Sequence, residues 1–260
     1  MSMPCYDAGP MSCGSLAGLR ILLTRPEGQG ADEWAVAFAR AGAVPIAYPT
    51  VTILPPKSWQ PVDEAVARLD AYDWLVFTSQ TAVGLFASRL PCGRFSSALH
   101  AKIAAVGKST AQSVERQGGK VALMPADSRQ EGLVEGLRGL TAGTRVLLPL
   151  AAGGRTLLAQ SLRTAGCTVE VVTIYRTEPK PDLPEPPDFD VAIFASPSAL
   201  HAFVVRFGTS SLAGKTIAAI GPTTAKEAET SGLRAVVANA PGVDALVLAI
   251  SQSRPNEGGI

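Results

Sequence analysis

The sequence predicts a protein of the α/β class with two similar domains, each holding a parallel β-sheet between helices. Three observations support this prediction. Short apolar runs alternate with helix-length segments, many of those segments end at glycine, and several runs recur together with their flanking residues. A parallel sheet covered by helices on both faces produces this alternation, because its strands are buried on both sides.

The predicted strands are apolar runs of three to six residues, several of them without alternation of polar and apolar side chains. They are Ile21–Thr24, Trp74–Thr78, Ile103–Val106, Val121–Met124, Val146–Leu148, Val169–Ile174, Val191–Phe194, Ile217–Ile220 and Ala235–Ala238. Continuously apolar runs are typical of strands that helices cover on both faces.

The predicted helices have apolar residues every three or four positions, which is the spacing of one helix face. They include Ala31–Ala41, Thr81–Arg89, Thr110–Gln117 and Thr224–Ser231. Glycine follows three of these segments and also ends a fourth at Gly166. These glycines predict helix ends, because glycine readily adopts the left-handed conformation common after a helix.

Two stretches of the chain repeat each other. Asp73–Ser79 (DWLVFTS) matches Asp190–Ser196 (DVAIFAS), and Lys102–Gly107 (KIAAVG) matches Thr216–Gly221 (TIAAIG). A proline closes the next strand in both copies, and the three separations are 117, 114 and 116 residues. This near-constant separation predicts two copies of one fold.

A further pair of similar segments is permuted. Arg20–Thr24 resembles Arg145–Pro149 at a separation of 125 residues, so this element comes first in one copy and last in the other. The simplest explanation is one domain inserted into the other. Each domain then has about five strands, close to the flavodoxin-like order. The predicted boundaries are residues 20–44 plus 179–252 for domain one, 54–168 for domain two, 45–53 and 169–178 for two extended connecting strands, and 1–19 and 253–260 for tails.

Composition excludes several classes of protein. The chain has 260 residues, of which 47% are hydrophobic and 17% charged, with a net charge of +1. Wholesale disorder is excluded, and the balanced charge argues against nucleic-acid binding through the overall field. No apolar run reaches the length of a membrane span, and residues 1–19 lack the features of a signal peptide, so we expect a cytoplasmic protein.

Motifs for metal or nucleotide binding are missing from the sequence. The four cysteines form no Cys-x-x-Cys pair and the chain has two histidines, so we expect no metal site. No complete Gly-x-Gly-x-x-Gly, phosphate-binding loop or Gly-x-Ser-x-Gly motif is present.

Gly, Ser and Thr are concentrated where the predicted strands end. These strand ends are Thr24–Pro26, Thr78–Ser79, Gly107–Thr110, Leu150–Arg155, Ser196–Ser198 and Gly221–Thr224. Open parallel sheets bind ligands at this edge, and helix N-termini there attract anions. Capping of the next helix is the commoner explanation for any single loop. Their recurrence in both domains favours an anion-binding cleft, which the loops would line if the domains face each other.

Together these features resemble the uroporphyrinogen-III synthase family over nearly all of residues 20–250. The resemblance rests on LTRP at 23–26, FTS at 77–79, AVGKST at 105–110, GR at 154–155, IYRT at 174–177, FASPS at 194–198 and AIGPTTA at 219–225. The chain departs from the family pattern at Pro149-Leu150 and Gln80-Thr81.

The resemblance implies a reaction and a set of partners. The substrate would be hydroxymethylbilane, a linear tetrapyrrole with eight carboxylates, which loses its terminal hydroxyl as water and closes with ring D inverted. The implied route runs through an azafulvene and a spiro intermediate without metal or organic cofactor. A monomer that receives its substrate from hydroxymethylbilane synthase is also implied.

The same resemblance implies the site residues. Tyr175, which by pattern alone is a packed strand tyrosine, would hydrogen-bond the departing hydroxyl and help protonate it. Carboxylates would be bound at strand ends by Ser79, Gly107, Thr110, Ser196, Gly221, Thr223 and Thr224, with Arg25 and Lys108 as further ion-pairing candidates. Arg155 would instead cap or brace its own helix.

A second hypothesis fits the same loops. A non-catalytic two-domain sensor or binding protein for an anionic small molecule would also need polar strand ends and a hinge between its domains. Turnover and its dependence on Tyr175 distinguish the two hypotheses.

Overall fold

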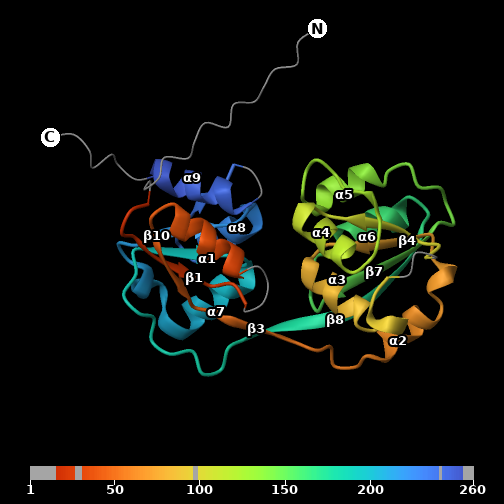
Figure 1. The fold of residues 1–260 in the computed structure, drawn as a ribbon, viewed down its shortest axis with the longest axis horizontal. Helices are drawn as coiled ribbons and strands as arrows, with labels where there is room; N and C mark the ends of the chain where they lie inside the picture. Colours follow the sequence, from red (N-terminus) through yellow and green to blue (C-terminus); the bar gives the residue numbers. More distant parts are fainter. Residues whose placement is uncertain (1–15, 27–30, 96–98, 240–241, 254–260) are drawn as a thin grey trace, which may run out of the picture. The chain divides into compact units, whose positions relative to one another are not determined.

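The chain forms two compact units in a computed structural model that describes residues 16–26, 31–95, 99–239 and 242–253 (Figure 1). Unit 1 comprises Met1–Thr52 and Glu178–Ile260, and unit 2 comprises Ile53–Thr177. Both are α/β structures with parallel sheets, which confirms the predicted fold class.

Unit 1 contains a five-stranded parallel sheet in the order β11-β10-β9-β1-β2. Its elements are β1 (Arg20–Leu23), α1 (Ala31–Arg40), β2 (Val44–Ala47), β9 (Val191–Phe194), α7 (Pro197–Phe207), β10 (Thr216–Ala219), α8 (Pro222–Thr230), β11 (Val236–Val237) and α9 (Val243–Ser253). Numbered along the chain, this order is 2-1-3-4-5, the flavodoxin-like arrangement.

Unit 2 contains a six-stranded sheet in the order β3-β8-β7-β4-β5-β6. Its elements are β3 (Val51–Leu54), α2 (Gln60–Ala67), β4 (Trp74–Phe77), α3 (Gln80–Ala87), β5 (Lys102–Ala105), α4 (Lys108–Arg116), β6 (Val121–Leu123), α5 (Gln130–Gly136), β7 (Arg145–Ala151), α6 (Leu157–Thr164) and β8 (Thr168–Pro179). The first two residues of β3 and the last two of β8 belong to unit 1. Short 3₁₀ turns cover Leu69–Ala71 and Pro91–Gly93 here, and Thr209–Leu212 in unit 1.

The strand orders confirm the permuted repeat. In unit 2, β7, β8, β4, β5 and β6 occupy the places that β1, β2, β9, β10 and β11 occupy in unit 1. The element that begins unit 1 therefore comes late in unit 2. The five matching strands of each sheet pair in parallel because helices return the chain to the same edge between them.

Each sheet has a separate apolar core on each face. In unit 1, Ile21 and Leu23 pack with α1 and α9, whereas Leu22 packs with α7 and α8. In unit 2, Leu75 and Phe77 face α2, α3 and α4, and Val76 faces α5 and α6. Adjacent strand residues point to opposite faces, so the continuously apolar runs supply both cores.

The structure corrects the predicted organisation in two stretches. Residues 16–19 were expected in the N-terminal tail, but Leu16 and Leu19 are buried in unit 1, and the Leu16 N–H donates to the Ala41 carbonyl at 2.9 Å. Residues 45–47 were expected in a connecting strand, but they lie in β2 and pair with β1. Both stretches are short, and tertiary pairing rather than local pattern orders them.

The second predicted connecting strand has a double role. Residues 169–178 lie within β8, which pairs with β7 over Arg145–Ala151 and also neighbours β3 in the sheet order. Most of this segment therefore belongs to the sheet of unit 2. Residues 1–15 and 254–260 of the predicted tails lie outside the described residues.

Candidate functional site

Tyr175 and Ser79 meet at the carboxyl edge of the unit 2 sheet. The Tyr175 Oη lies 3.3 Å from the Ser79 Oγ, within hydrogen-bond distance. Tyr175 is half-buried and its ring packs against the apolar cluster that α2, α3 and α4 form with the sheet. Its hydroxyl is thus held by a polar partner while its ring is held by apolar ones.

An irregularity in the β7–β8 ladder positions Tyr175. Leu150 pairs with Thr173 but Ala151 pairs with Tyr175, so Ile174 is one extra residue on β8. The Ala152 N–H then donates to the Tyr175 carbonyl at 2.7 Å. Such bulges change the direction of a side chain, and they are over-represented near active sites.

Ser79 connects the tyrosine to a helix N-terminus. Its backbone is extended, with φ −155° and ψ 149°, and its Oγ accepts a hydrogen bond from the Ala82 N–H at 3.1 Å, so it caps α3. The predicted capping role and the contact with Tyr175 therefore coexist in one hydroxyl. A hydroxyl that accepts one bond can still donate another.

The loop after β5 presents Gly107, Lys108 and Thr110. Gly107 is extended and buried, and a Cβ there would lie 2.8 Å from the Ser128 Oγ. Lys108 is exposed, whereas Thr110 is only 3% exposed. The structure therefore places Lys108 in solvent and buries the threonine beside it.

Unit 1 has matching strand ends. The Ser196 Oγ caps α7 by accepting from the Ala199 N–H at 3.2 Å, and it lies 3.0 Å from the Ser198 Oγ. Gly221 precedes α8 in an extended conformation, and among the residues that the structure describes a Cβ there would have no neighbour within 4 Å. Thr223 is exposed and Thr224 is 3% exposed.

Arg25 lies at the end of β1 beside α1. Its guanidinium carbon is 4.6 Å from the centre of the Trp34 ring, a cation–π contact. Burial lowers the pKa of Arg25, and the nearby Glu33 carboxylate opposes that shift. The predicted ion-pairing candidate is thus stacked on an aromatic ring of its own unit.

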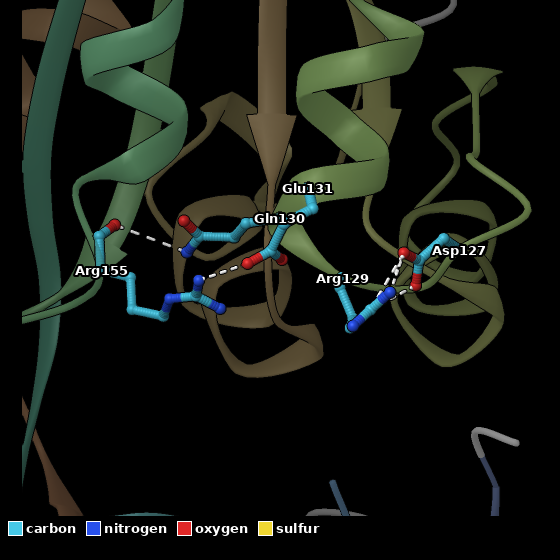
Figure 2. Close-up of polar contacts among 5 residues, drawn as sticks. All are labelled: Asp127, Arg129, Gln130, Glu131 and Arg155. Carbon is cyan, nitrogen blue, oxygen red and sulfur yellow. Dashed lines mark hydrogen bonds and ion pairs between the residues drawn. The ribbon is translucent and has the colours of Figure 1, made fainter. Parts of the chain in front are cut away.

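A cluster of charged residues, of which the sequence analysis named only Arg155, lies at the same edge of unit 2 (Figure 2). Arg129 forms a two-nitrogen pair with Asp127, with its Nη2 at 2.6 Å from the Oδ2. The Arg155 Nη2 lies 2.5 Å from the Glu131 Oε1, and the Gln130 Nε2 donates to the Arg155 carbonyl at 3.4 Å. These residues make up what we call the α5 brace, Asp127–Glu131 together with Arg155.

The α5 brace corrects one expectation. Arg155 was considered as a cap of its own helix, but its guanidinium bonds to Glu131 in the first turn of α5. That hydrogen bond lowers the pKa of Glu131, and Arg129 likewise lowers the pKa of Asp127. The alternating charges of DSRQE at 127–131 were visible in the sequence, but their partner 24 residues away was not.

Among the residues that the structure describes, no group of three or more His, Cys, Asp or Glu side chains is arranged to hold a metal ion. In the same ranges, every helix is too short or too polar to cross a bilayer.

Comparisons with known proteins agree on one family. The family profile described as uroporphyrinogen-III synthase HemD matches residues 32–248. A uroporphyrinogen-III synthase of Synechococcus elongatus is 35% identical, over 91% of this chain and 96% of its own length. The solved uroporphyrinogen-III synthetase of Helicobacter pylori covers 91% of this chain and 100% of its own at 19% identity and a TM-score of 0.61. A mutant synthase of Thermus thermophilus covers 90% and 98% at 16% identity and a TM-score of 0.60, so both structures support the fold.

Proposed function

This chain belongs to the uroporphyrinogen-III synthase family, and from that premise we propose how its residues close the tetrapyrrole ring. The protein is a cyclising hydro-lyase of tetrapyrrole biosynthesis, and its family acts on hydroxymethylbilane. In the reaction a C–O bond breaks, the oxygen takes up a proton, and the hydroxyl leaves as water while the macrocycle closes.

Tyr175 assists departure of that hydroxyl in our proposal. The observation that supports this role most directly is the 3.3 Å contact between the Tyr175 Oη and the Ser79 Oγ at the carboxyl edge of the sheet. Because Ser79 accepts from the Ala82 N–H, its own proton is available to Tyr175. The phenol proton is then free to point at the leaving oxygen.

This arrangement forms a short relay of hydrogen-bond dipoles. The N–H at the start of α3 polarises Ser79, Ser79 polarises Tyr175, and the phenol donates to the leaving hydroxyl. A phenol is a weak acid, so hydrogen-bond assistance suits it better than complete proton transfer before the bond breaks. General-acid assistance typically contributes about 10²-fold or more to a rate.

The decisive experiment is Tyr175→Phe, assayed for isomer III on enzymatically generated hydroxymethylbilane. We expect kcat to fall about 10²-fold while KM changes little, because only the hydroxyl is removed. Tyr48→Phe is the matched control, since Tyr48 donates to the Pro184 carbonyl within unit 1. Full turnover by the Tyr175 variant would refute the proposed role. If only isomer I forms in the presence of the parent chain, the chain has no synthase activity and the binding-protein hypothesis remains.

The remaining strand ends bind substrate carboxylates in the proposal. A flexible polyanion is bound by many modest contacts, for which helix N-termini and hydroxyls are suited at a net charge of +1. The proposed contacts are Ser79, Gly107, Lys108 and Thr110 from unit 2, and Arg25, Ser196, Gly221, Thr223 and Thr224 from unit 1. Thr223→Val and Lys108→Ala, both at exposed positions, should raise KM several-fold without lowering kcat.

We also propose how the protein works in its surroundings. It acts as a cytoplasmic monomer that receives the labile substrate from hydroxymethylbilane synthase. Light scattering tests the monomer, and coupled turnover in the presence of excess inactive variant tests the handover. If handover is direct, the inactive variant competes for hydroxymethylbilane synthase. The yield of isomer III then falls by more than the amount of free substrate that the inactive variant binds.

A further inference from the structure

We propose that the α5 brace positions Tyr175, with the Glu131–Arg155 ion pair as its central contact. This inference rests on the proposed role of Tyr175. Neither Glu131 nor Arg155 is required to touch substrate, and both act through the loop between β7 and α6.

The loop between β7 and α6 is what connects the brace to the tyrosine. It follows Ala151, the last residue of β7, which pairs with Tyr175, and it begins with Ala152, whose N–H donates to the Tyr175 carbonyl at 2.7 Å. Its other end is Arg155, which immediately precedes Thr156 and α6. A shift of this loop therefore moves the backbone partner of Tyr175.

Two side chains from the first turn of α5 hold Arg155. Glu131 bonds its guanidinium at 2.5 Å, and Gln130 donates to its carbonyl at 3.4 Å (Figure 2). One contact restrains the side chain and the other restrains the backbone. These contacts hold the end of the loop against α5, although Gly153 and Gly154 give the loop backbone more conformational freedom than other residues would.

The brace is itself anchored in unit 2. Gly132 lies so close to the preceding loop that a Cβ there would be 2.1 Å from the Asp127 carbonyl oxygen, so only glycine fits. Ser128 fills the space above Gly107, and Arg129 is paired with Asp127. The segment therefore packs on the end of β5 and holds the end of β7, two neighbours of Ser79 at one sheet edge.

Charge favours positioning over direct substrate binding. The brace contains two carboxylates and two guanidiniums, each paired at 2.5–2.6 Å, so its net charge is zero. A site built to attract a polyanion would leave its arginines available, whereas a brace pairs them. Small misplacements of a catalytic group can cost up to about 10²-fold in rate, so a brace of this kind is expected to act on kcat.

The test compares Glu131→Ala with a control pair on the same helical segment. Glu135 and Arg138 form an exposed ion pair at 2.6 Å, so Glu135→Ala removes a comparable contact that does not reach the loop. We expect Glu131→Ala to lower kcat about five- to tenfold with KM within about twofold, and Glu135→Ala to change neither. The charge-reversed pair Glu131→Arg with Arg155→Glu should recover most of the loss.

A double-mutant cycle separates positioning from substrate contact. Adding Glu131→Ala to Tyr175→Phe should lower kcat by less than about twofold, because the residue it positions has already lost its reacting group. Independent, multiplicative losses, or a change in KM alone, would overturn the inference. Ring-carbon NMR of the four tyrosines should show the Tyr175 signal moved by Glu131→Ala but not by Glu135→Ala.

These outcomes distinguish the inference from the function beneath it. If Tyr175→Phe abolishes turnover while the Glu131 variant is fully active with an unmoved Tyr175 signal, the brace alone is refuted. If Tyr175→Phe is fully active, the proposed role of Tyr175 is refuted, and the positioning role of the α5 brace is refuted with it.

Discussion

Units 1 and 2 share one spatial arrangement of five strands but differ in the residues that surround the carboxyl ends of those strands. Ser79 and Ser196 cap equivalent helices, but Ser79 also contacts a tyrosine, whereas Ser196 also contacts the neighbouring Ser198. Gly107 is covered by Ser128, whereas no atom of the described residues would lie within 4 Å of a Cβ at Gly221. The repeat thus supplies a common framework, and residues outside the repeat make each unit distinct.

The amino ends of the strands are more alike. The Asp190 carboxylate accepts the Arg20 N–H at 2.8 Å in unit 1, and the Asp73 carboxylate accepts the Arg145 N–H at 2.8 Å in unit 2. These contacts join corresponding strands of the permuted repeat. Contacts that only hold the framework are kept in both units, whereas the carboxyl edge, where ligands bind in such sheets, has diverged.

The largest expected contrast is between Ser79→Ala and Ser196→Ala. Each loses a helix cap and about 1 kcal/mol of stability. Only Ser79→Ala also loses the contact to Tyr175, so we expect its kcat to fall about tenfold while Ser196→Ala acts mainly on KM. Steady-state assays measure kcat and KM, and denaturant titrations measure the loss of stability. Equal losses of kcat in the two variants would contradict a special role for Ser79.

A smaller contrast is expected between Gly107→Ala and Gly221→Ala. Both glycines are extended, so alanine is compatible with either backbone. The new methyl group at 107 meets Ser128, and we expect a loss of about 1–3 kcal/mol, whereas at 221 the change should stay within about 0.5 kcal/mol. Urea unfolding of the two variants measures the loss of unfolding free energy. Equal losses would mean that the loop at Ser128 moves aside and accommodates the new methyl group without strain.

Alkaline pH should weaken both units by comparable amounts. Burial raises the pKa of Tyr48 in unit 1 and of Tyr72 in unit 2 to about 12, with a further contribution from the Glu170 hydrogen bond at Tyr72. The unfolded phenol titrates near 10, so this stability is complete below pH 10 and is lost between about pH 10 and 12. We expect a loss on the order of 2 kcal/mol for each tyrosine.

The alkaline effect is measured by unfolding at pH 9 and at pH 11.5. Tyr48→Phe and Tyr72→Phe should each remove part of the difference, because phenylalanine does not titrate. If the free energy of unfolding of the wild type were the same at both pH values, the two tyrosines would not be the cause of an alkaline loss of stability. The same conclusion would follow for one tyrosine if its phenylalanine variant kept the full pH dependence of the wild type.

The smallest contrast is expected at the amino ends of the strands. Asp73→Ala and Asp190→Ala each remove one carboxylate bond to a backbone N–H, worth about 1 kcal/mol. Asp190 also lies 3.6 Å from the Arg20 side chain, but that exposed pair adds less than about 0.5 kcal/mol. Thermal unfolding should therefore place the two variants close together, and a large difference would show that the framework contacts are not equivalent.

Much of the fold followed from local pattern. The apolar runs at Trp74–Thr78 and Val191–Phe194 became central strands, and the glycines after α1, α4 and α8 mark the helix ends. Residues 16–19 and 45–47 were assigned wrongly because short apolar stretches have no period of their own. Leu16 is ordered by its contacts with α1, and β2 by its pairing with β1.

The candidate site was predictable only in part. Ser79 and Tyr175 could be named from motifs, but their 3.3 Å contact joins residues 96 positions apart, and the bulge at Ile174 that directs Tyr175 has no sequence signature of its own. The α5 brace was missed for the same reason. Its central ion pair joins Glu131 to Arg155, 24 residues away in the sequence.

The sequence alone determined the α/β class, the permuted repeat and the family, because these depend on local periodicity and on the order of motifs along the chain. Tertiary structure decided which hydroxyls meet, which glycine is covered and which arginine is paired. Those features depend on how distant strand ends come together at one sheet edge, and a one-dimensional pattern contains no direct record of that distance.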